Sequence, residues 1–261
     1  MTYKIFIPRD SSSISLGANE VYQAILNESK TRNIDIDIIR NGSRGLFWLE
    51  PMIEVETSKG RVAYGPVSVS DVKSLFDNKF YLGKKHNLFL GITEEIKWLK
   101  NQERLTYARV GIIDPLDIDE YEKLDGFKGL KNSIKLNSEN IVKEITDSGL
   151  RGRGGAAFPT GIKWKTVLDA PSDKKYIVCN ADEGDSGTFS DRMIMENDPF
   201  VLIEGMIIAG LAVGSDQGYI YLRSEYPHAL EILNEAIKIA LNKGYLGKNI
   251  FGSDFSFNLE V

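Results

Sequence analysis

Residues 149–163 read GLRGRGGAAFPTGIK and hold five of the chain's 24 glycines together with two arginines and a lysine. A backbone with so few side chains lets its N–H groups approach a ligand closely, and the cations suit a phosphate. No other stretch of the chain is so poorly suited to packing a core. We therefore interpret this glycine-rich loop as an anion- or nucleotide-binding segment, with a flexible surface loop as the alternative.

Gly152 and Gly154 begin a loose match to the dinucleotide-binding fingerprint, in which small residues allow close approach to a pyrophosphate. The fingerprint follows a strand, whereas the segment before this loop, Ser138–Ser148, has the pattern of a helix that is N-capped by its first residue. Thr160 is placed to cap a second helix over 161–169. The loop therefore differs from a standard Rossmann first turn, and without a Gly-Lys-Ser/Thr ending it is not a P-loop.

An acidic turn, NADEGDSGT at 180–188, follows an expected buried strand at Lys175–Cys179. Ligands of open α/β sheets bind beyond the carboxyl ends of the strands, which is where this turn lies. Its carboxylates would repel a phosphate, so we expect them to accept hydrogen bonds from ribose or ribityl hydroxyls and from ring N–H groups. The alternative is a turn that caps the following helix.

The second half of the chain alternates between helical and strand patterns. An apolar helix is expected at Pro199–Gly214, a strand at Tyr219–Arg223 and an amphipathic helix at His228–Asn242. The apolar stretch Phe200–Val213 is too short to span a bilayer and is better interpreted as a buried helix. Alternation of this kind predicts an α/β domain with a largely parallel sheet.

The front of the chain has a different order of elements. The polar segment Asn78–Asn87 is the expected linker, which gives domains over 1–86 and 87–261. The order β-α-β-β-α is typical of a thioredoxin-like domain of about 80 residues. The expected elements are strands at Tyr3–Pro8 and Ile34–Ile39, a helix at Asn19–Arg32, strands at Met52–Glu56 and Arg61–Tyr64, and a helix at Val69–Phe76.

Charge and cysteine content argue against several function classes. The formal net charge of -5 over 261 residues is unsuited to binding a nucleic-acid backbone. Cys179 is the one cysteine, too few for a disulfide or an iron–sulfur site, and we interpret it as a small buried group. Neither His86 nor His228 is expected to bind a metal or act as a base. With no apolar targeting segment at the N-terminus, the cytoplasm is the expected compartment.

A second basic turn with glycines, RNGSRGLFW at Arg40–Trp48, lies in the front domain. Its glycines and arginines are compatible with a nucleotide loop. We favour a tight turn whose aromatic side chains pack or face a partner.

Longer runs of sequence resemble the FMN-binding, NADH-oxidising subunit of respiratory complex I and its soluble relatives. These relatives include the flavin subunits of NAD-reducing hydrogenases and of molybdenum or tungsten formate dehydrogenases. The runs that carry the resemblance are 149–164, 179–192, 197–206, 219–226 and 244–252. The runs Ile7–Ser11, Arg40–Pro51 and Val62–Val67 resemble the beta subunit of soluble NAD-dependent formate dehydrogenase, in which a thioredoxin-like domain precedes a Rossmann-like FMN-binding domain.

The resemblance implies a cofactor site between the two loops. FMN is expected to contact one group of residues in the glycine-rich loop and another in the acidic turn, namely Gly152, Arg153, Gly154 and Lys163, and Asn180, Asp182 and Glu183. NAD(H) is expected near Gly155, Ala156 and Phe158, with Asp185 close to the nicotinamide or its ribose. Hydride transfer between NAD(H) and FMN is chemistry that the cofactors carry, so no catalytic residue and no metal ligand is assigned.

The resemblance also implies iron–sulfur partners. In relatives, a Cys-Gly-Glu-Glu segment completes the flavin pocket and later cysteines hold a 4Fe–4S cluster, and both are expected beyond Val261. The resemblance therefore implies a C-terminally truncated flavin domain that exchanges electrons with clusters outside this chain, in a missing continuation or in iron–sulfur and molybdenum or tungsten subunits. Three alternatives stay open: a non-catalytic fragment or docking subunit, a flavin subunit of an NADH:quinone oxidoreductase or NAD-reducing hydrogenase, and an adenine-nucleotide-binding domain without redox function.

Overall fold

A computed structural model describes residues 2–261, which form two compact units. The first unit comprises the described residues up to Asp117 together with Glu196–Asp198. The second comprises Ile118–Met195 and Pro199–Val261. Both units are mixed α/β structures, as the sequence predicts.

The first unit is built on a mixed sheet of five strands in the order β2-β1-β3-β4-β5. Strands β1 and β2 are parallel, whereas β3 is antiparallel to both β1 and β4. This arrangement of the first four strands is the one that the thioredoxin-like prediction requires. The strands are β1 (Tyr3–Phe6), β2 (Ile36–Ile39), β3 (Ile53–Thr57), β4 (Gly60–Tyr64) and β5 (Phe89–Ile92).

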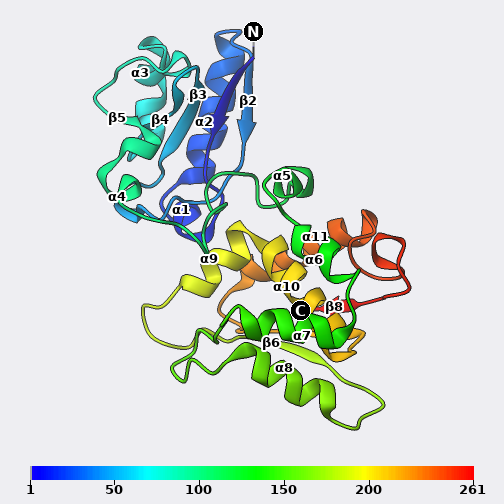
Figure 1. Ribbon diagram of the computed structural model, residues 1–261. Helices are drawn as coiled ribbons and strands as arrows, with labels where there is room; N and C mark the ends of the chain where they lie inside the picture. The colour runs from blue at the N-terminus through cyan, green and yellow to red at the C-terminus, as the bar shows by residue number, and fades with distance from the viewer. Residues whose placement is uncertain (1) are drawn as a thin grey trace. The chain divides into compact units, whose positions relative to one another are not determined.

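Helices α2 (Ala18–Thr31) and α3 (Val72–Asp77) pack on the sheet of the first unit (Figure 1). Val21 and Ile25 of α2, one turn apart, are fully buried against strand residues such as Ile5 and Val55. The short helices α1 (Ser11–Ser15) and α4 (Lys97–Lys100) lie outside this core cluster. The helical spacing seen in the sequence therefore marks the buried face of α2.

The segment predicted to be a linker contributes to the core of the first unit. Phe80, in a 3-10 turn at Phe80–Leu82, is fully buried and contacts the ring of Tyr64 at a centroid distance of 5.9 Å. Strand β5 then pairs with β4. The compact unit consequently continues past the boundary expected near residue 86, because burial of Phe80 and pairing of β5 tie 78–92 to the sheet.

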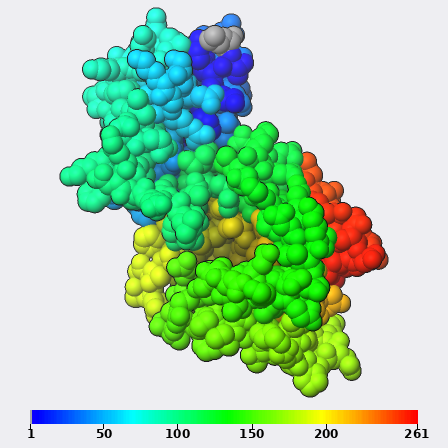
Figure 2. All heavy atoms as spheres, viewed as in Figure 1, coloured from blue at the N-terminus to red at the C-terminus, as the bar shows by residue number. Residues whose placement is uncertain are grey.

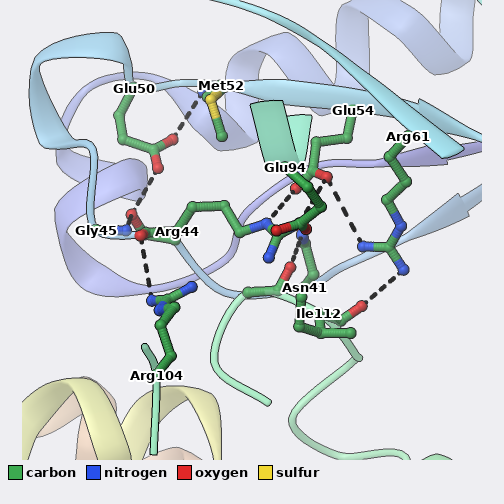
Figure 3. Close-up of polar contacts among 12 residues, drawn as sticks. Asn41, Arg44, Gly45, Glu50, Met52, Glu54, Arg61, Glu94, Arg104 and Ile112 are labelled. Atoms are coloured by element: carbon green, nitrogen blue, oxygen red, sulfur yellow. Dashed lines mark hydrogen bonds and ion pairs between the residues drawn. The ribbon is translucent and has the colours of Figure 1, made fainter. Parts of the chain in front are cut away.

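The basic turn at Arg40–Trp48 is largely buried in the first unit (Figure 3). The Arg44 guanidinium is 3% exposed, donates to Glu54 at 3.0 Å and also pairs with Glu94. Trp48, by contrast, is 58% exposed and contacts Trp98 edge to face at 5.9 Å. The turn is thus a packed structural element with an exposed aromatic, which agrees with the favoured interpretation and not with a nucleotide loop.

Glu50 is a buried carboxyl group in the same region. Its oxygens accept hydrogen bonds from the Ser43 hydroxyl at 2.6 Å and from the Met52 N–H at 2.7 Å (Figure 3). Burial, opposed by these hydrogen bonds and reinforced by the charge of Asp10, raises the pKa of Glu50 to about 7. The folded state therefore holds this proton at pH values where the unfolded chain, with an ordinary value of 4.5, has lost it.

This difference predicts that the stability of the first unit falls as the pH rises. Between pH 4.5 and 7 the folded state binds more protons than the unfolded state, so the free energy of unfolding decreases by about 3 kcal/mol. In Glu50→Gln the free energy of unfolding should change less between pH 4.5 and 7 than in the wild-type chain, as measured by urea unfolding at several pH values. Glu56→Gln, at an exposed site on β3, is the matched control; if both variants keep the wild-type slope, the account of Glu50 is wrong.

The second unit has a parallel sheet of three strands in the order β6-β7-β8. The strands are β6 (Ile177–Ala181), β7 (Gln217–Leu222) and β8 (Asn258–Glu260). The helices are α5 (Ile118–Lys123), α6 (Lys128–Ser133), α7 (Ser138–Asp147), α8 (Thr160–Asp169), α9 (Ser190–Asn197), α10 (Pro199–Val213) and α11 (Pro227–Asn242). On the face drawn in Figure 2, α7 and α8 form a continuous green surface.

Helix α10 is the buried centre of the second unit. Its one carboxylate, Glu204, is 8% exposed and accepts hydrogen bonds from the Tyr121 hydroxyl at 2.5 Å and from the N–H groups of Phe127 and Leu130 at 2.8 and 3.0 Å. This network explains how a charged residue fits within an apolar helix. Among residues 2–261 no helix is long and apolar enough to cross a membrane.

The helix caps beside the glycine-rich loop differ from the sequence predictions. Asn137, and not Ser138, is the N-cap of α7, where its side chain accepts from the Asn140 N–H at 2.9 Å. Helix α8 begins at Thr160 after Pro159, with no side-chain cap, because Thr160 already adopts the helical backbone. Both helices nevertheless flank the loop as predicted.

Candidate functional site

The second unit contains a cavity of about 920 Å³ at the carboxyl end of β6. The walls are formed by the glycine-rich loop, the acidic turn after β6, the first turns of α9, and Leu202 of α10. The carboxyl end of a parallel strand is the position that the sequence predicts for a ligand.

The glycine-rich loop is closed at its neck by backbone hydrogen bonds. The Gly152 N–H donates to the Phe158 carbonyl at 2.8 Å, and the Thr160 N–H donates to the Leu150 carbonyl at 2.9 Å. Ala157 at the tip has a φ of 45°, an uncommon value for a residue with a side chain. The loop therefore has a hairpin-like path.

Three glycines that line the cavity have no structural reason to be glycine. A Cβ atom added to Gly154 or Gly184 would meet nothing within 4 Å, and one added to Gly152 would make only ordinary contacts. None of the three has a positive φ, unlike Gly149 with a φ of 69°. Neither backbone conformation nor packing within the chain requires glycine at these sites, whereas a ligand lying against the backbone would require it.

A few local hydrogen bonds shape the acidic turn. The Gly184 N–H donates to the Asp182 carbonyl at 2.9 Å, and the Thr188 N–H donates to the Asp185 carbonyl at 3.1 Å. The Asn180 side-chain oxygen accepts from the Asp182 N–H at 3.1 Å. From Asp182 to Ser190, Glu183 is the one buried residue, and the other side chains of this segment are exposed.

Glu183 has a different role from the one expected for a flavin contact. Its Oε1 accepts from the Ser190 hydroxyl and the Asp191 N–H at 2.9 and 2.8 Å, and its Oε2 accepts from the Arg192 N–H and the Tyr226 hydroxyl, both at 3.1 Å. These four donors occupy the four lone-pair positions of the carboxylate, which leaves none for a flavin N–H. Glu183 lines the cavity, but its carboxylate caps α9, the alternative that the sequence left open.

The surroundings of Glu183 keep its carboxylate charged. Burial disfavours the charge, but the hydrogen bonds from Asp191, Arg192, Ser190 and Tyr226 outweigh it and lower the pKa. The neighbouring Asp191 has a raised pKa because of burial and the negative charge of Glu183. The anionic Glu183 also matches the positive end of the α9 dipole.

Helix α9 supplies a wall that the sequence analysis did not identify. Asp191, Ile194 and Met195 all line the cavity, and their spacing of three and four residues places them on one face of the helix. The same helical spacing is visible in the sequence from Asp191 onward, and it could have identified this wall. With Leu202, it adds an apolar surface to a site that is otherwise polar.

The structure brings together eight of the eleven predicted site residues. The eight that line the cavity are Gly152, Arg153, Gly154, Lys163, Asn180, Asp182, Glu183 and Asp185. The other three, Gly155, Ala156 and Phe158, belong to the same loop but do not line the cavity, and Phe158 is 48% exposed.

Cys179 lies on β6 at the base of the cavity. Burial, with a smaller contribution from the charge of Asp191, raises the pKa of the thiol to about 11. The thiol therefore stays protonated near neutral pH, which does not suit a nucleophile. The prediction of a buried strand is wrong, because Cys179 is only partly buried and Val178 beside it is 61% exposed.

This raised pKa predicts slow alkylation of Cys179. At pH 8 the rate with iodoacetamide should be on the order of a hundredfold lower than for glutathione, because only the thiolate reacts. The rate should still climb between pH 8 and 9.5, as followed by intact-mass spectrometry. A rate that levels off near pH 8 would show that the thiol is activated.

The donor set of the cavity fits a ligand such as FMN. Arg153 and Lys163 supply positive charge for a phosphate, and the oxygens of Asn180, Asp182 and Asp185 supply acceptors for hydroxyl and ring N–H groups. The space beside the backbone of Gly154 and Gly184 is empty of protein atoms, so a ligand can lie against it. Among residues 2–261 no group of three or more His, Cys, Asp or Glu side chains is arranged to hold a metal ion.

Comparison with known families supports a flavin site in this unit. Residues 145–260 match a family model described as the Nuo51 FMN-binding domain. This range contains both loops, the strands β6 and β7, and the whole cavity.

Curated relatives align with more than half of the chain. The HndC component of the NADP-reducing hydrogenase of Solidesulfovibrio fructosivorans is 48% identical over 162 residues, which are 62% of this chain and 33% of that protein. A component of the NADH-quinone oxidoreductase of Aquifex aeolicus is 49% identical over 144 residues, which are 55% of this chain and 34% of that protein. The chain thus spans about a third of the length of these relatives.

A solved structure of an NAD+-reducing NiFe-hydrogenase aligns with more of the chain but less closely. It is 21% identical, with a TM-score of 0.41, over 98% of this chain and 42% of that one. A likeness of this degree supports no functional argument.

Proposed function

We propose that the second unit binds FMN in the cavity beside β6 and exchanges hydride between this flavin and NAD(H). The observation that carries the proposal is the set of cavity-lining glycines, Gly152, Gly154 and Gly184, which the chain's own backbone and packing do not require. Gly152 and Gly154 adjoin the cation Arg153, and Gly184 adjoins the carboxylates of Glu183 and Asp185. The family match over residues 145–260 identifies FMN as the ligand class to test first.

In this proposal each wall of the cavity recognises a different part of the cofactor. Arg153, Lys163 and the exposed N–H groups of the glycine-rich loop hold the phosphate. Asn180, Asp182 and Asp185 accept hydrogen bonds from ribityl hydroxyls and ring N–H groups, and the apolar wall from α9 excludes water beside the ring. Glu183 contributes by shaping the acidic turn, since its carboxylate has no free lone pair.

NAD(H) is assigned to the outer part of the loop. Gly155 and Ala156 offer exposed backbone, and the half-exposed ring of Phe158 is available for stacking on adenine. Asp185, at the edge of the cavity, is placed near the nicotinamide or its ribose. The cofactors carry the hydride chemistry, so the chain supplies orientation and electrostatics and no acid, base or nucleophile.

We further propose that the chain works as the flavin subunit of an NAD-linked oxidoreductase complex. Its electrons pass to or from iron–sulfur clusters outside residues 1–261, in a continuation of the polypeptide or in partner subunits, because the one cysteine in these residues cannot hold a cluster. The front unit favours a formate dehydrogenase with molybdenum or tungsten, as its sequence resemblance suggests. The named relatives, from a hydrogenase and from an NADH-quinone oxidoreductase, keep the other two branches as alternatives.

The proposal predicts that Gly154→Val abolishes FMN binding without unfolding the chain. The added side chain enters space that no protein atom occupies, so the melting temperature without ligand should stay within a few degrees. FMN affinity should fall at least a hundredfold, measured by quenching of flavin fluorescence. Such a loss corresponds to about 3 kcal/mol for steric exclusion of a buried contact.

Gly155→Val is the matched control, because Gly155 has equally open surroundings in the same loop but does not line the cavity. This variant should keep FMN affinity within about threefold. NADH:ferricyanide reductase activity should disappear in Gly154→Val together with the bound flavin. Equal FMN affinity in Gly154→Val and the wild-type chain would exclude the placement of FMN against this loop.

A further inference from the structure

The acidic turn has few anchors of its own. Glu183 is the one buried residue from Asp182 to Ser190, and it is held both by the nearby residues 190–192 and by a distant part of the sequence. The distant part is the segment after β7, residues 223–226, which supplies one contact to the carbonyl oxygen of Glu183 and one to its carboxylate. The turn therefore depends on a neighbouring strand end for its position.

Tyr226 contacts both ends of this turn. Its hydroxyl donates to Glu183 Oε2 at 3.1 Å and lies 3.4 Å from the Thr188 carbonyl oxygen. Its ring is flanked by two guanidinium groups, with centroid distances of 5.1 Å to Arg223 and 5.8 Å to Arg192. The phenol is thus fixed in place by contacts on its faces and at its tip.

Arg223 holds the backbone of the same turn. Its Nη1 donates to the Glu183 carbonyl oxygen, and its Nη2 pairs with Glu225 at 3.0 Å. Its backbone N–H lies 3.4 Å from the Ala181 carbonyl, where β6 ends. The side chain and the main chain of Arg223 therefore both bind the start of the acidic turn to the end of β7.

Neither Arg223 nor Tyr226 lines the cavity, so any effect on a ligand passes through Glu183 and the turn. We propose that Arg223 and Tyr226 are positioning residues that hold the acidic turn and the start of α9 in the ligand-binding arrangement by binding Glu183. The proposal rests on the FMN site proposed above. A turn fixed before the ligand arrives loses less conformational entropy on binding, which raises affinity.

Tyr226→Phe is the most direct test, because it removes the hydroxyl and keeps the ring that both guanidinium groups contact. FMN affinity should fall about tenfold, the effect of losing one hydrogen bond to a charged group. Tyr219→Phe removes a phenol hydroxyl from β7, where the side chain does not line the cavity, and should leave affinity unchanged. Equal affinity in Tyr226→Phe and Tyr219→Phe would overturn the proposal.

A double-mutant cycle separates positioning from general destabilisation. If Tyr226 acts through Glu183, Tyr226→Phe should have no further effect on FMN affinity in a Glu183→Gln background. Independent effects of the two substitutions, which multiply in the double variant, would overturn this assignment. Melting temperatures without FMN show whether the variants are folded, and Arg223→Lys should lose less affinity than Arg223→Ala.

Amide hydrogen exchange tests the positioning role of Tyr226 even if the wild-type chain binds no FMN. The N–H groups of Asp191 and Arg192 donate to Glu183, so their exchange without ligand should be faster in Tyr226→Phe. Unchanged exchange at both amides would overturn the positioning role. If the chain does not bind FMN but these amides exchange faster in Tyr226→Phe, the proposed cofactor is wrong and the positioning role of Tyr226 is supported.

Discussion

The saturated carboxylate of Glu183 is the constraint on which the candidate site depends. Four donors, two from side chains and two from the first turn of α9, converge on its two oxygens. A buried carboxylate is stable only when its hydrogen bonds are satisfied, so this set of contacts fixes three things together. These are the path of the acidic turn, the start of α9 and the end of β7.

The rest of the cavity follows from this arrangement. Because Glu183 points into the protein, Asp182 and Asp185 on either side of it are exposed. Because α9 begins at Ser190, its Ile194 and Met195 face the cavity one turn later. The result is a site with cations on the glycine-rich loop, acceptors on the turn and an apolar wall, which is the combination that a flavin mononucleotide needs.

Periodic patterns allowed most elements to be predicted from the sequence. The alternation of helix and strand predicted a parallel sheet in the second unit, and the β-α-β-β-α order predicted the sheet of the first. Local rules were less precise where two capping residues are adjacent, as at Asn137 and Ser138. Burial of Phe80 was not predicted either, because the apolar run Phe80–Leu82 is short and lies within the polar segment 78–87.

The candidate site shows the same division between local and distant information. The bare glycines and the carboxylates after a strand identified both loops, because the relevant chemistry lies within each short segment. The capping role of Glu183 was left open as an alternative, because three of its donors are nearby in the sequence. Its contact with Tyr226 could not be predicted, because Tyr226 lies 43 residues away and depends on the pairing of β6 with β7. No spacing rule connects two residues that are joined only by the fold.

The central claim is that the cavity already has the shape that FMN requires. A crystal structure of the chain grown with FMN tests this most directly. Our account predicts flavin density against the backbone of Gly154 and Gly184, with the phosphate near Arg153 and Lys163 and all four hydrogen bonds to Glu183 retained. Flavin density at another surface, or a Glu183 carboxylate released from Tyr226 and α9 to bind the ring, would contradict it.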